Sequence, residues 1–242
     1  MQLENRNSQQ REKGEIRGVL AIWNDVDPRG EIEYNEWYVQ QHMLERLAIP
    51  GFLAGRRYEA VGGGLKYFTY YLTTSVDILK SPAYLQRLNH PTDWTRRNMA
   101  WFKNMNRTAC RETLDQGRGI GCAALTLEIK PISGREEELR WRISESLFPD
   151  LLGSPGATGI IRAHLWEGDP EITIQRTNEL ALRGGRDQMV YWVMVVEASS
   201  PTQAENAGKL LTDYTLKAWG AESVGSPYIY RLLHHVQGPD GR

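Results

Sequence analysis

The chain has 242 residues, a formal net charge of −1 at pH 7 and 40% hydrophobic residues. This length is sufficient for one large domain or two small ones with real apolar cores. The near-neutral charge, without a long basic block, argues against nucleic acid as a partner. The two cysteines, Cys110 and Cys122, lack any metal-ligand spacing, and we expect buried thiols on strands in a reducing compartment.

The sequence also argues against a membrane partner. No apolar run approaches the roughly 20 residues that a helix needs to cross a bilayer. Residues 1–15 are polar and charged, without the apolar segment of a secretory signal. These features predict a cytoplasmic protein with disordered tails at 1–15 and 237–242.

Between the tails the chain reads strand, helix, strand, strand, helix, strand, and then repeats this order. Residues 16–115 form the first copy and residues 119–236 the second, and the period is too long for a solenoid. The expected elements of the first copy are Arg17–Asn24, Glu31–Leu47, Phe52–Ala60, Leu65–Thr73, Val76–Leu88 and Arg107–Leu114. Those of the second copy are Cys122–Lys130, Arg135–Leu151, Gly159–Trp166, Met189–Glu197, Pro201–Trp219 and Tyr228–His235.

One strand of the second copy indicates how the copies pack. Residues 190–196 are apolar at every position, so both faces of this strand must be covered. Helices of the same copy cover one face, and the sheet of the other copy covers the other. The predicted fold is therefore α+β, with two βαββαβ units whose four-stranded antiparallel sheets pack face to face as an intrachain barrel.

Two segments interrupt the repeat. Residues 167–188 form a long polar connection, which is either a lid or a long hairpin. In residues 90–106, Trp94, Trp101 and neighbouring residues recur at helical spacing. This pattern predicts an extra helix, which either docks on the core or forms an aromatic wall over a pocket.

The first helix carries the candidate catalytic group. Tyr38, His42 and Glu45 lie one turn apart on one helix face, beside a stripe that contains Trp37 and Gln41. A histidine between a tyrosine and a glutamate can be oriented and held near a neutral pKa, as a general base requires. Surface helices also carry such sets by chance.

The segment Glu36-Trp37-Tyr38…His42…Ile49-Pro50-Gly51-Phe52 resembles the dimeric α/β-barrel superfamily, and is most similar to its EthD-like (ethyl tert-butyl ether degradation) branch. This resemblance implies tandem ferredoxin-like repeats, with a pocket between the sheet and helices of each unit. The second copy has Leu147-Phe148-Pro149 and Ser154-Pro155-Gly156-Ala157 in place of the histidine and the Pro-Gly-Phe turn. Only the first copy is therefore expected to keep the pocket.

Neighbouring strands complete the candidate site. Arg56 and Arg57 point to opposite faces of the second strand, so one of them faces the helices. There it would bind a substrate carboxylate or enolate, or else pair with an acidic residue of the chain. We assign catalytic roles to His42, Tyr38, Glu45 and Arg57. Candidate substrate-binding residues, which could equally be core, are Trp37, Gln41, Arg56, Tyr70, His90, Trp94 and Trp101.

The resulting prediction is a cofactor-independent enzyme that acts on a small aromatic or hydrophobic metabolite by proton transfer, of the lyase, isomerase or cyclase type. Family members also include monooxygenases and, on distant branches, haem enzymes. The alternatives are therefore a haem-dependent dehydratase or peroxidase-like enzyme, a cofactor-free monooxygenase, or a protein that only binds a hydrophobic ligand. His164 with His234 or His235 could ligate a metal, but the sequence offers no third ligand, and we predict none. A homodimer is compatible with the fused barrel.

Overall fold

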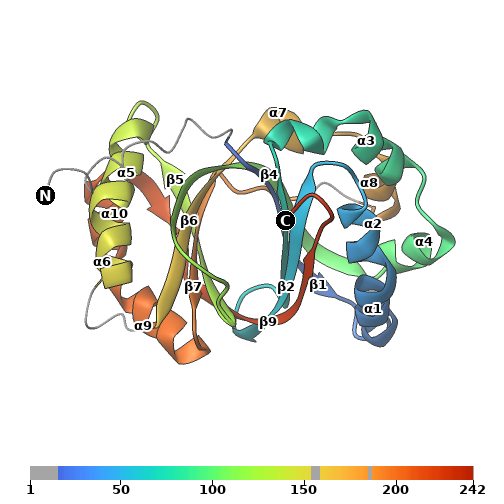
Figure 1. Ribbon diagram of the computed structural model, residues 1–242, viewed down its shortest axis with the longest axis horizontal. Helices are drawn as coiled ribbons and strands as arrows, with labels where there is room; N and C mark the ends of the chain where they lie inside the picture. Colours follow the sequence, from blue (N-terminus) through green and yellow to red (C-terminus); the bar gives the residue numbers. More distant parts are fainter. Residues whose placement is uncertain (1–15, 154–158, 185–186, 242) are drawn as a thin grey trace, which may run out of the picture.

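The computed structural model describes residues 16–153, 159–184 and 187–241, so the predicted tail at 1–15 lies outside the described residues. The strands form one antiparallel sheet in the order β7-β6-β4-β1-β3-β2-β9-β5-β8. A further pairing of β5 with β7 closes all strands except β8 into a barrel. The fold is thus α+β, with helices packed outside a closed antiparallel barrel (Figure 1).

The strands of the barrel occur where the sequence predicts them, whereas the short strand at Ala221–Val224 is not predicted. In the first half they are β1 (Gly18–Val26), β2 (Phe52–Gly62), β3 (Tyr67–Thr73) and β4 (Phe102–Gly117). In the second half they are β5 (Ala123–Pro131), β6 (Ile160–Gly168), β7 (Trp192–Ala198), the short β8 (Ala221–Val224) and β9 (Tyr228–Gln237). The strand β4 begins earlier than expected, directly after the extra helix.

The helices lie in two groups on opposite sides of the barrel (Figure 1). The first group contains α1 (Glu31–Trp37), the π-helical turn η1 (Tyr38–His42), α2 (Met43–Leu47), the 3₁₀ turn η2 (Val76–Lys80), α3 (Pro82–Asn89) and α4 (Asp93–Met99). The second contains α5 (Glu136–Arg142), the π-helical turn η3 (Ile143–Leu147), α6 (Phe148–Gly153), α9 (Pro201–Leu210) and α10 (Asp213–Ala218). Among the helices of the described residues, none is long and apolar enough to cross a membrane.

The two halves meet edge to edge. The first half contributes β4-β1-β3-β2 to the barrel, and the second contributes β9-β5-β7-β6. Antiparallel pairing of β2 with β9 and of β4 with β6 joins them. Closure leaves none of these strands as an open edge for pairing with another chain.

Three apolar clusters fill the spaces between these layers. One lies between the first sheet and its helices, one lies between the second sheet and its helices, and one lies inside the barrel. The strand β7 is buried at every residue. Its Trp192 and Met194 pack toward the second helices, whereas Val193 and Val195 lie inside the barrel. This arrangement confirms the expected cover on both faces.

The connection between β6 and β7 crosses to the other half of the molecule. It contains α7 (Pro170–Thr173) and α8 (Asn178–Leu182), and both lie against the first half (Figure 1). Ile172 is part of the first apolar cluster, and Asn178 donates its backbone N–H to the side-chain oxygen of Asn89 at 3.0 Å. The connection therefore covers the helical side of the half to which it does not belong.

Two local predictions differ from the structure. Residues 238–241, expected to be disordered, fold back over β2, where the Gly238 N–H donates to the Leu53 carbonyl at 2.7 Å. The thiol of Cys110 is buried inside the barrel as expected, but Cys122 is exposed because it lies just before β5.

Candidate functional site

The first helix contains a π-helical turn, with one extra residue, where it carries the candidate histidine. In η1 the N–H of Met43 bonds the carbonyl of Tyr38, so this turn contains one residue more than an α-helical turn. The inserted residue rotates the helix that follows. Arg46 and Leu47 are buried as a result, whereas Leu44 is exposed. Residues in π-helical turns are frequently functional.

His42 is enclosed by aromatic rings and arginines. Its side chain is buried, and its ring lies 4.1 Å from that of Trp37 and 4.9 Å from that of Tyr38, measured between centroids. Burial, together with the charges of Arg46, Arg183 and Arg57, holds the pKa of His42 well below its usual value. Among the described residues, Nδ1 has no hydrogen-bond partner. His42 is thus a neutral imidazole.

Arg57 faces the helices, on the same side of the sheet as His42. Its guanidinium lies over the rings of Tyr38 and Tyr67, at 4.5 and 4.2 Å from their centroids. One nitrogen donates to the side-chain oxygen of Asn35 at 2.6 Å. Arg57 therefore places a positive charge beneath the helix of His42 without a carboxylate partner in the described part of the chain.

Arg46 lies one turn after His42 and forms a buried ion pair with the insertion. Its Nη2 donates to both carboxylate oxygens of Glu179, at 2.5 and 2.7 Å. Burial disfavours the charge of Arg46, but Glu179 outweighs this effect and raises its pKa. Arg46 therefore stays charged, and its ion pair with Glu179 fastens α8 to the helix of His42.

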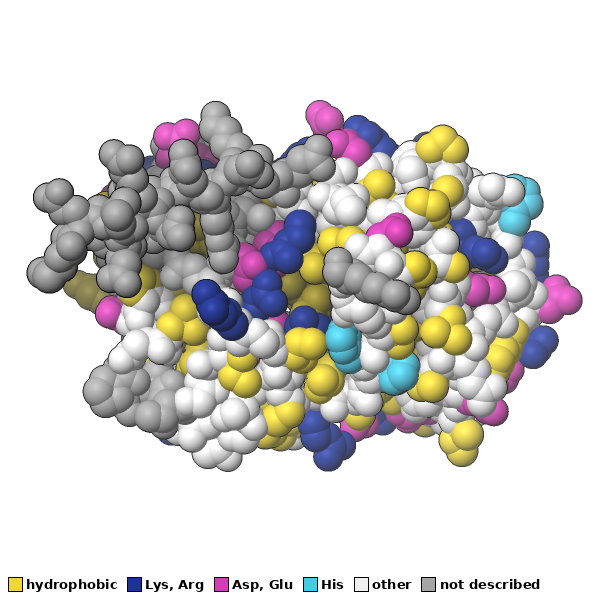
Figure 2. Space-filling model, in the orientation of Figure 1, with side chains coloured by type: hydrophobic (Ala, Val, Ile, Leu, Met, Phe, Trp, Pro, Cys, Tyr) yellow, Lys and Arg dark blue, Asp and Glu magenta, His cyan; other side chains and the backbone are white. Residues whose placement is uncertain are grey.

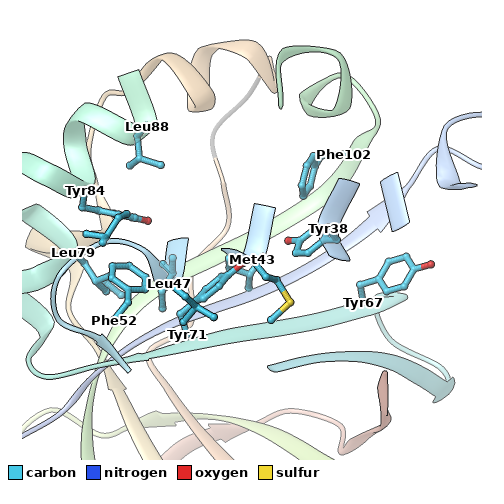
Figure 3. Packing of buried hydrophobic residues seen from close by; sticks show 14 of the residues in the cluster. Tyr38, Met43, Leu47, Phe52, Tyr67, Tyr71, Leu79, Tyr84, Leu88 and Phe102 are labelled. Carbon is cyan, nitrogen blue, oxygen red and sulfur yellow. The ribbon is translucent and has the colours of Figure 1, made fainter. Parts of the chain in front are cut away.

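Two cavities lie beside this ion pair. The larger, of about 660 Å³, lies between α3, β4 and the insertion, and has a volume suited to a small-molecule ligand. The smaller, of about 20 Å³, is bordered by Tyr38 and His42 and holds little more than a water molecule. Figure 3 shows its walls, with Tyr84 and Leu88 of α3 on one side, Tyr38 and Phe102 on the other, and Tyr71 of the sheet below. Both cavities are lined by Leu88, Arg107, Glu179 and Arg183.

Several predicted site residues lie elsewhere. Arg56 and Tyr70 point into the barrel, on the opposite face of the sheet from His42, because strand residues alternate. Glu45 lies toward Arg87 at 3.6 Å rather than toward His42, and Arg46 is the buried residue one turn after His42. Within the described chain, Glu45 and His42 share no hydrogen bond or ion pair through which Glu45 could orient the imidazole as the sequence predicts.

The other predicted binding residues contact neighbouring side chains of the protein. Gln41 donates to the hydroxyl of Thr92 at 2.6 Å, and the indole N–H of Trp37 donates to Thr95 at 3.3 Å. Trp94 and Trp101 pack against the first apolar cluster, and α4 is the extra helix that they predict. Within the described chain, the residues that line the two cavities do not include His90, Trp94 or Trp101.

A second polar cluster lies inside the barrel. His164 bonds Glu112 through Nδ1 at 2.8 Å and Glu197 through Nε2 at 3.0 Å, and Glu197 also accepts from Arg56 at 2.6 Å. Burial alone would lower the pKa of His164, but these two carboxylates outweigh it and raise the pKa to about 8. Figure 2 shows acidic and basic side chains together on the outer surface near the middle of this view. The cluster joins strands of both halves.

This cluster fits poorly to a metal ion. Ligand atoms of Glu112, Asp115 and His164 lie within 4.8 Å of one another, which supplies the third ligand that the sequence did not reveal. His164 donates through both ring nitrogens, however, and a metal requires a free ring lone pair. The oxygens of Asp115 already accept from Arg162, at 2.6 Å each.

Haem also fits poorly to the residues present. The residues of the described chain that line the 660 Å³ cavity include no histidine, cysteine or tyrosine that could serve as a strong axial ligand. His42 opens only onto the 20 Å³ cavity. The corresponding space in the second half is filled by apolar side chains. We therefore derive no chemistry through haem.

The fold is shared with known proteins. No protein-family model and no curated protein matches the sequence. An anthrone oxidase-like protein is similar in structure, with a TM-score of 0.61 and 10% identity over 95% of this chain and 96% of that one. A candidate monooxygenase from Fusobacterium nucleatum has a TM-score of 0.59 and 11% identity over 92% and 95% of the chains. A mutant chlorite dismutase from Candidatus Nitrospira defluvii has a TM-score of 0.54 and 9% identity over 90% and 92%.

At this level of identity the comparisons establish the fold alone. The chain shares with these proteins a closed antiparallel barrel flanked by helices, which confirms the predicted α+β barrel at that level. Sequence reasoning missed Arg46, Glu179 and Arg183. Arg46 could have been found from its spacing of one turn from His42, whereas Glu179 and Arg183 carry no local signal because they come from the other half.

Proposed function

We propose that the chain is a cofactor-independent enzyme that transfers a proton to or from a small, mostly apolar substrate, with His42 as the general base or acid. The observation that carries this proposal is the neutral, buried imidazole with an unpaired Nδ1 at the edge of a cavity. A structural histidine in a core normally has partners for its ring nitrogens. The unpaired nitrogen of His42 is instead available to a ligand.

The groups around His42 suit a substrate that becomes negatively charged. Removal of a proton from carbon produces an enolate or phenolate, which cations and hydroxyl donors stabilise. Nη1 of Arg46 and the hydroxyl of Tyr71 are buried and without partners in the described chain. Burial raises the pKa of Tyr71 well above its usual value, so this hydroxyl keeps its proton and can donate a hydrogen bond to an oxyanion. Arg57 and Tyr38 would orient and polarise His42 from the sheet side.

The same groups support a lyase, isomerase or cyclase step, since each begins with proton transfer beside a carbonyl. We further propose that the two halves are tandem ferredoxin-like copies of an EthD-like unit. Each half has the same strand order, and each first helix has a π-helical turn at the same place. A cytoplasmic location and a homodimer remain predictions from the sequence.

Isotope exchange tests the proposal without knowledge of the full reaction. The protein is incubated in D₂O with small aromatic compounds that carry an acidic C–H beside a carbonyl, and deuterium uptake is followed by mass spectrometry. We expect exchange in the wild type and its loss in His42→Gln, with Gln40→Ala, at an exposed position of the same turn, as a control that keeps exchange. A folded His42→Gln protein that exchanges as fast as the wild type would remove His42 from the mechanism. Binding without exchange would favour a ligand-binding protein.

A cofactor-free monooxygenase is the second candidate, and the names of two structural neighbours favour it. Proton removal by His42 would again come first, and the resulting carbanion would react with molecular oxygen. Consumption of one O₂ per substrate, measured with an oxygen electrode, separates this reaction from an isomerisation, which consumes none. A Soret band after addition of haemin would instead support the haem alternative.

A further inference from the structure

The helix α8 is fastened to the first half by a charged side chain. Of its five residues, Glu179 is the buried one, with 4% of its surface exposed. Asn178, Ala181 and Leu182 are exposed. Short surface helices are normally held by apolar side chains, because a buried carboxylate loses its hydration. The position of Glu179 therefore needs an explanation other than packing.

The ion pair leaves half of the guanidinium unused. Both oxygens of Glu179 accept from the same nitrogen, Nη2 of Arg46, while Nη1 has no partner in the described chain. An arginine binds a carboxylate best when two nitrogens each donate to one oxygen. The same small cavity is lined by His42 and Tyr71, whose Nδ1 and hydroxyl also lack partners within the described residues. Together these groups could bind a carboxylate, and Glu179 contacts only one of them, Nη2 of Arg46.

Glu179 also separates the two cavities. It lines the 660 Å³ cavity on one side and the 20 Å³ cavity of His42 on the other, as does Arg183. The apolar walls of the larger cavity include Leu88, Leu180 and Met189. A ligand with an apolar body in the larger cavity would thus meet Glu179 on its way to His42.

We propose that Glu179 holds the place of the ligand's own carboxylate, and that the site takes a small, mostly apolar carboxylic acid. The carboxylate of the ligand would displace that of Glu179 from Arg46, while the body of the ligand fills the 660 Å³ cavity. One anion replaces another, so Arg46 stays paired, and Glu179 moves into water with the exposed helix α8. This inference rests on the proposed function, since it concerns the same site, and it names the substrate class.

The probe for this proposal is benzoate, with benzamide as its neutral counterpart, and binding is measured by isothermal titration calorimetry. In the wild type, competition by Glu179 leaves only a small fraction of the protein ready for an anion, and this fraction weakens the apparent affinity. We expect Glu179→Gln to bind benzoate at least about tenfold more tightly than the wild type. Benzamide affinity should not change, and Glu171→Gln, at an exposed position of the same insertion, should match the wild type.

A second variant guards against misfolding. Arg46→Met/Glu179→Met removes both charges together, which buried ion pairs generally tolerate, and it should fold but not bind benzoate. Equal benzoate affinity in Glu179→Gln and the wild type would overturn the proposal. So would an equal gain for benzamide, or retained binding by the double variant. Calorimetry needs no turnover, so absent isotope exchange alongside tightened benzoate binding would overturn the proposed function and leave this inference standing.

Discussion

The two halves of the molecule differ most at the same turn of the same helix. Each first helix contains a π-helical turn, η1 in the first half and η3 in the second. Counted from these turns, His42 corresponds to Leu147, and Arg46 corresponds to Leu151. In the second half these positions are apolar, fully or almost fully buried, and part of a filled core. In the first half they are polar and border cavities.

Because both halves contain the π-helical turn, the turn by itself is a feature of the fold and does not mark a functional site. What distinguishes the first half is the polar content of the turn and the cover supplied by the second half. The insertion reaches over the first helices and completes the cavity walls with Glu179 and Arg183. The second half therefore closes the barrel and covers the helical side of the first half.

The largest expected effect comes from exchanging the residue that distinguishes the two turns. His42→Leu gives the first half the residue of the second and should lower turnover about 10²–10⁴-fold, because it removes the acid–base group. Stability should not fall, since a buried nitrogen without a partner is replaced by an apolar group. The matched change Leu147→Ala should do the opposite, with a loss of about 2–5 kcal/mol of stability and unchanged turnover. Isotope exchange and urea unfolding measure the two effects, and a stability loss in His42→Leu would contradict this assignment.

The next effect concerns the buried charges. Arg46→Met leaves Glu179 buried without its cation and should lower the free energy of unfolding by about 3–5 kcal/mol. Its counterpart Leu151→Met, a volume-conserving change in an apolar core, should cost less than about 1.5 kcal/mol. The comparison is made by chemical denaturation. Similar losses in the two variants would show that the ion pair contributes no more than packing.

The two buried histidines should respond to pH in opposite directions. The pKa of His164 is about 8 in the folded protein, above the usual 6.5, so its stabilising contribution is present below pH 6.5 and is lost as pH rises through 8. This contribution amounts to about 2 kcal/mol. Folding lowers the pKa of His42. The free energy of unfolding therefore falls as pH drops below 6.5, because the unfolded chain takes up a proton there that the folded chain does not.

Unfolding free energies measured from about pH 5.5 to about pH 9 check both slopes. The variant His164→Gln should lose the alkaline decline, and His42→Leu should lose the acidic one. An alkaline decline of full size in His164→Gln would show that His164 does not join the halves through its two carboxylates.

The smallest effect is expected at Glu45, which the sequence places beside His42 and the structure places toward Arg87. Glu45→Gln should change isotope exchange by less than about twofold, because a partly exposed pair at this distance contributes little. The corresponding exposed residue of the second half, Asp150, provides the control Asp150→Asn. A loss of exchange in Glu45→Gln alone would restore Glu45 as the residue that orients His42.

The sequence by itself determined the elements and the fold class. Alternation of apolar residues and turn residues is local, and it correctly predicted the strands of the barrel and an α+β fold. The motif around His42 also indicated which half differs. These features depend on neighbours in the chain, and a period of two or of 3.6 residues reveals them directly.

Only the tertiary structure decided which side chains meet. Glu45 and Arg46 both lie about one turn after His42, and packing decides that Arg46 is buried toward Glu179 whereas Glu45 lies toward Arg87. Strand alternation places Arg56 and Arg57 on opposite faces, but barrel closure decides that Arg57 is the one beneath the helix. The pairing of Arg46 with Glu179 joins residues far apart in the chain, because the insertion folds across to the other half. Such contacts arise from the packing of the whole molecule, so local sequence patterns do not predict them.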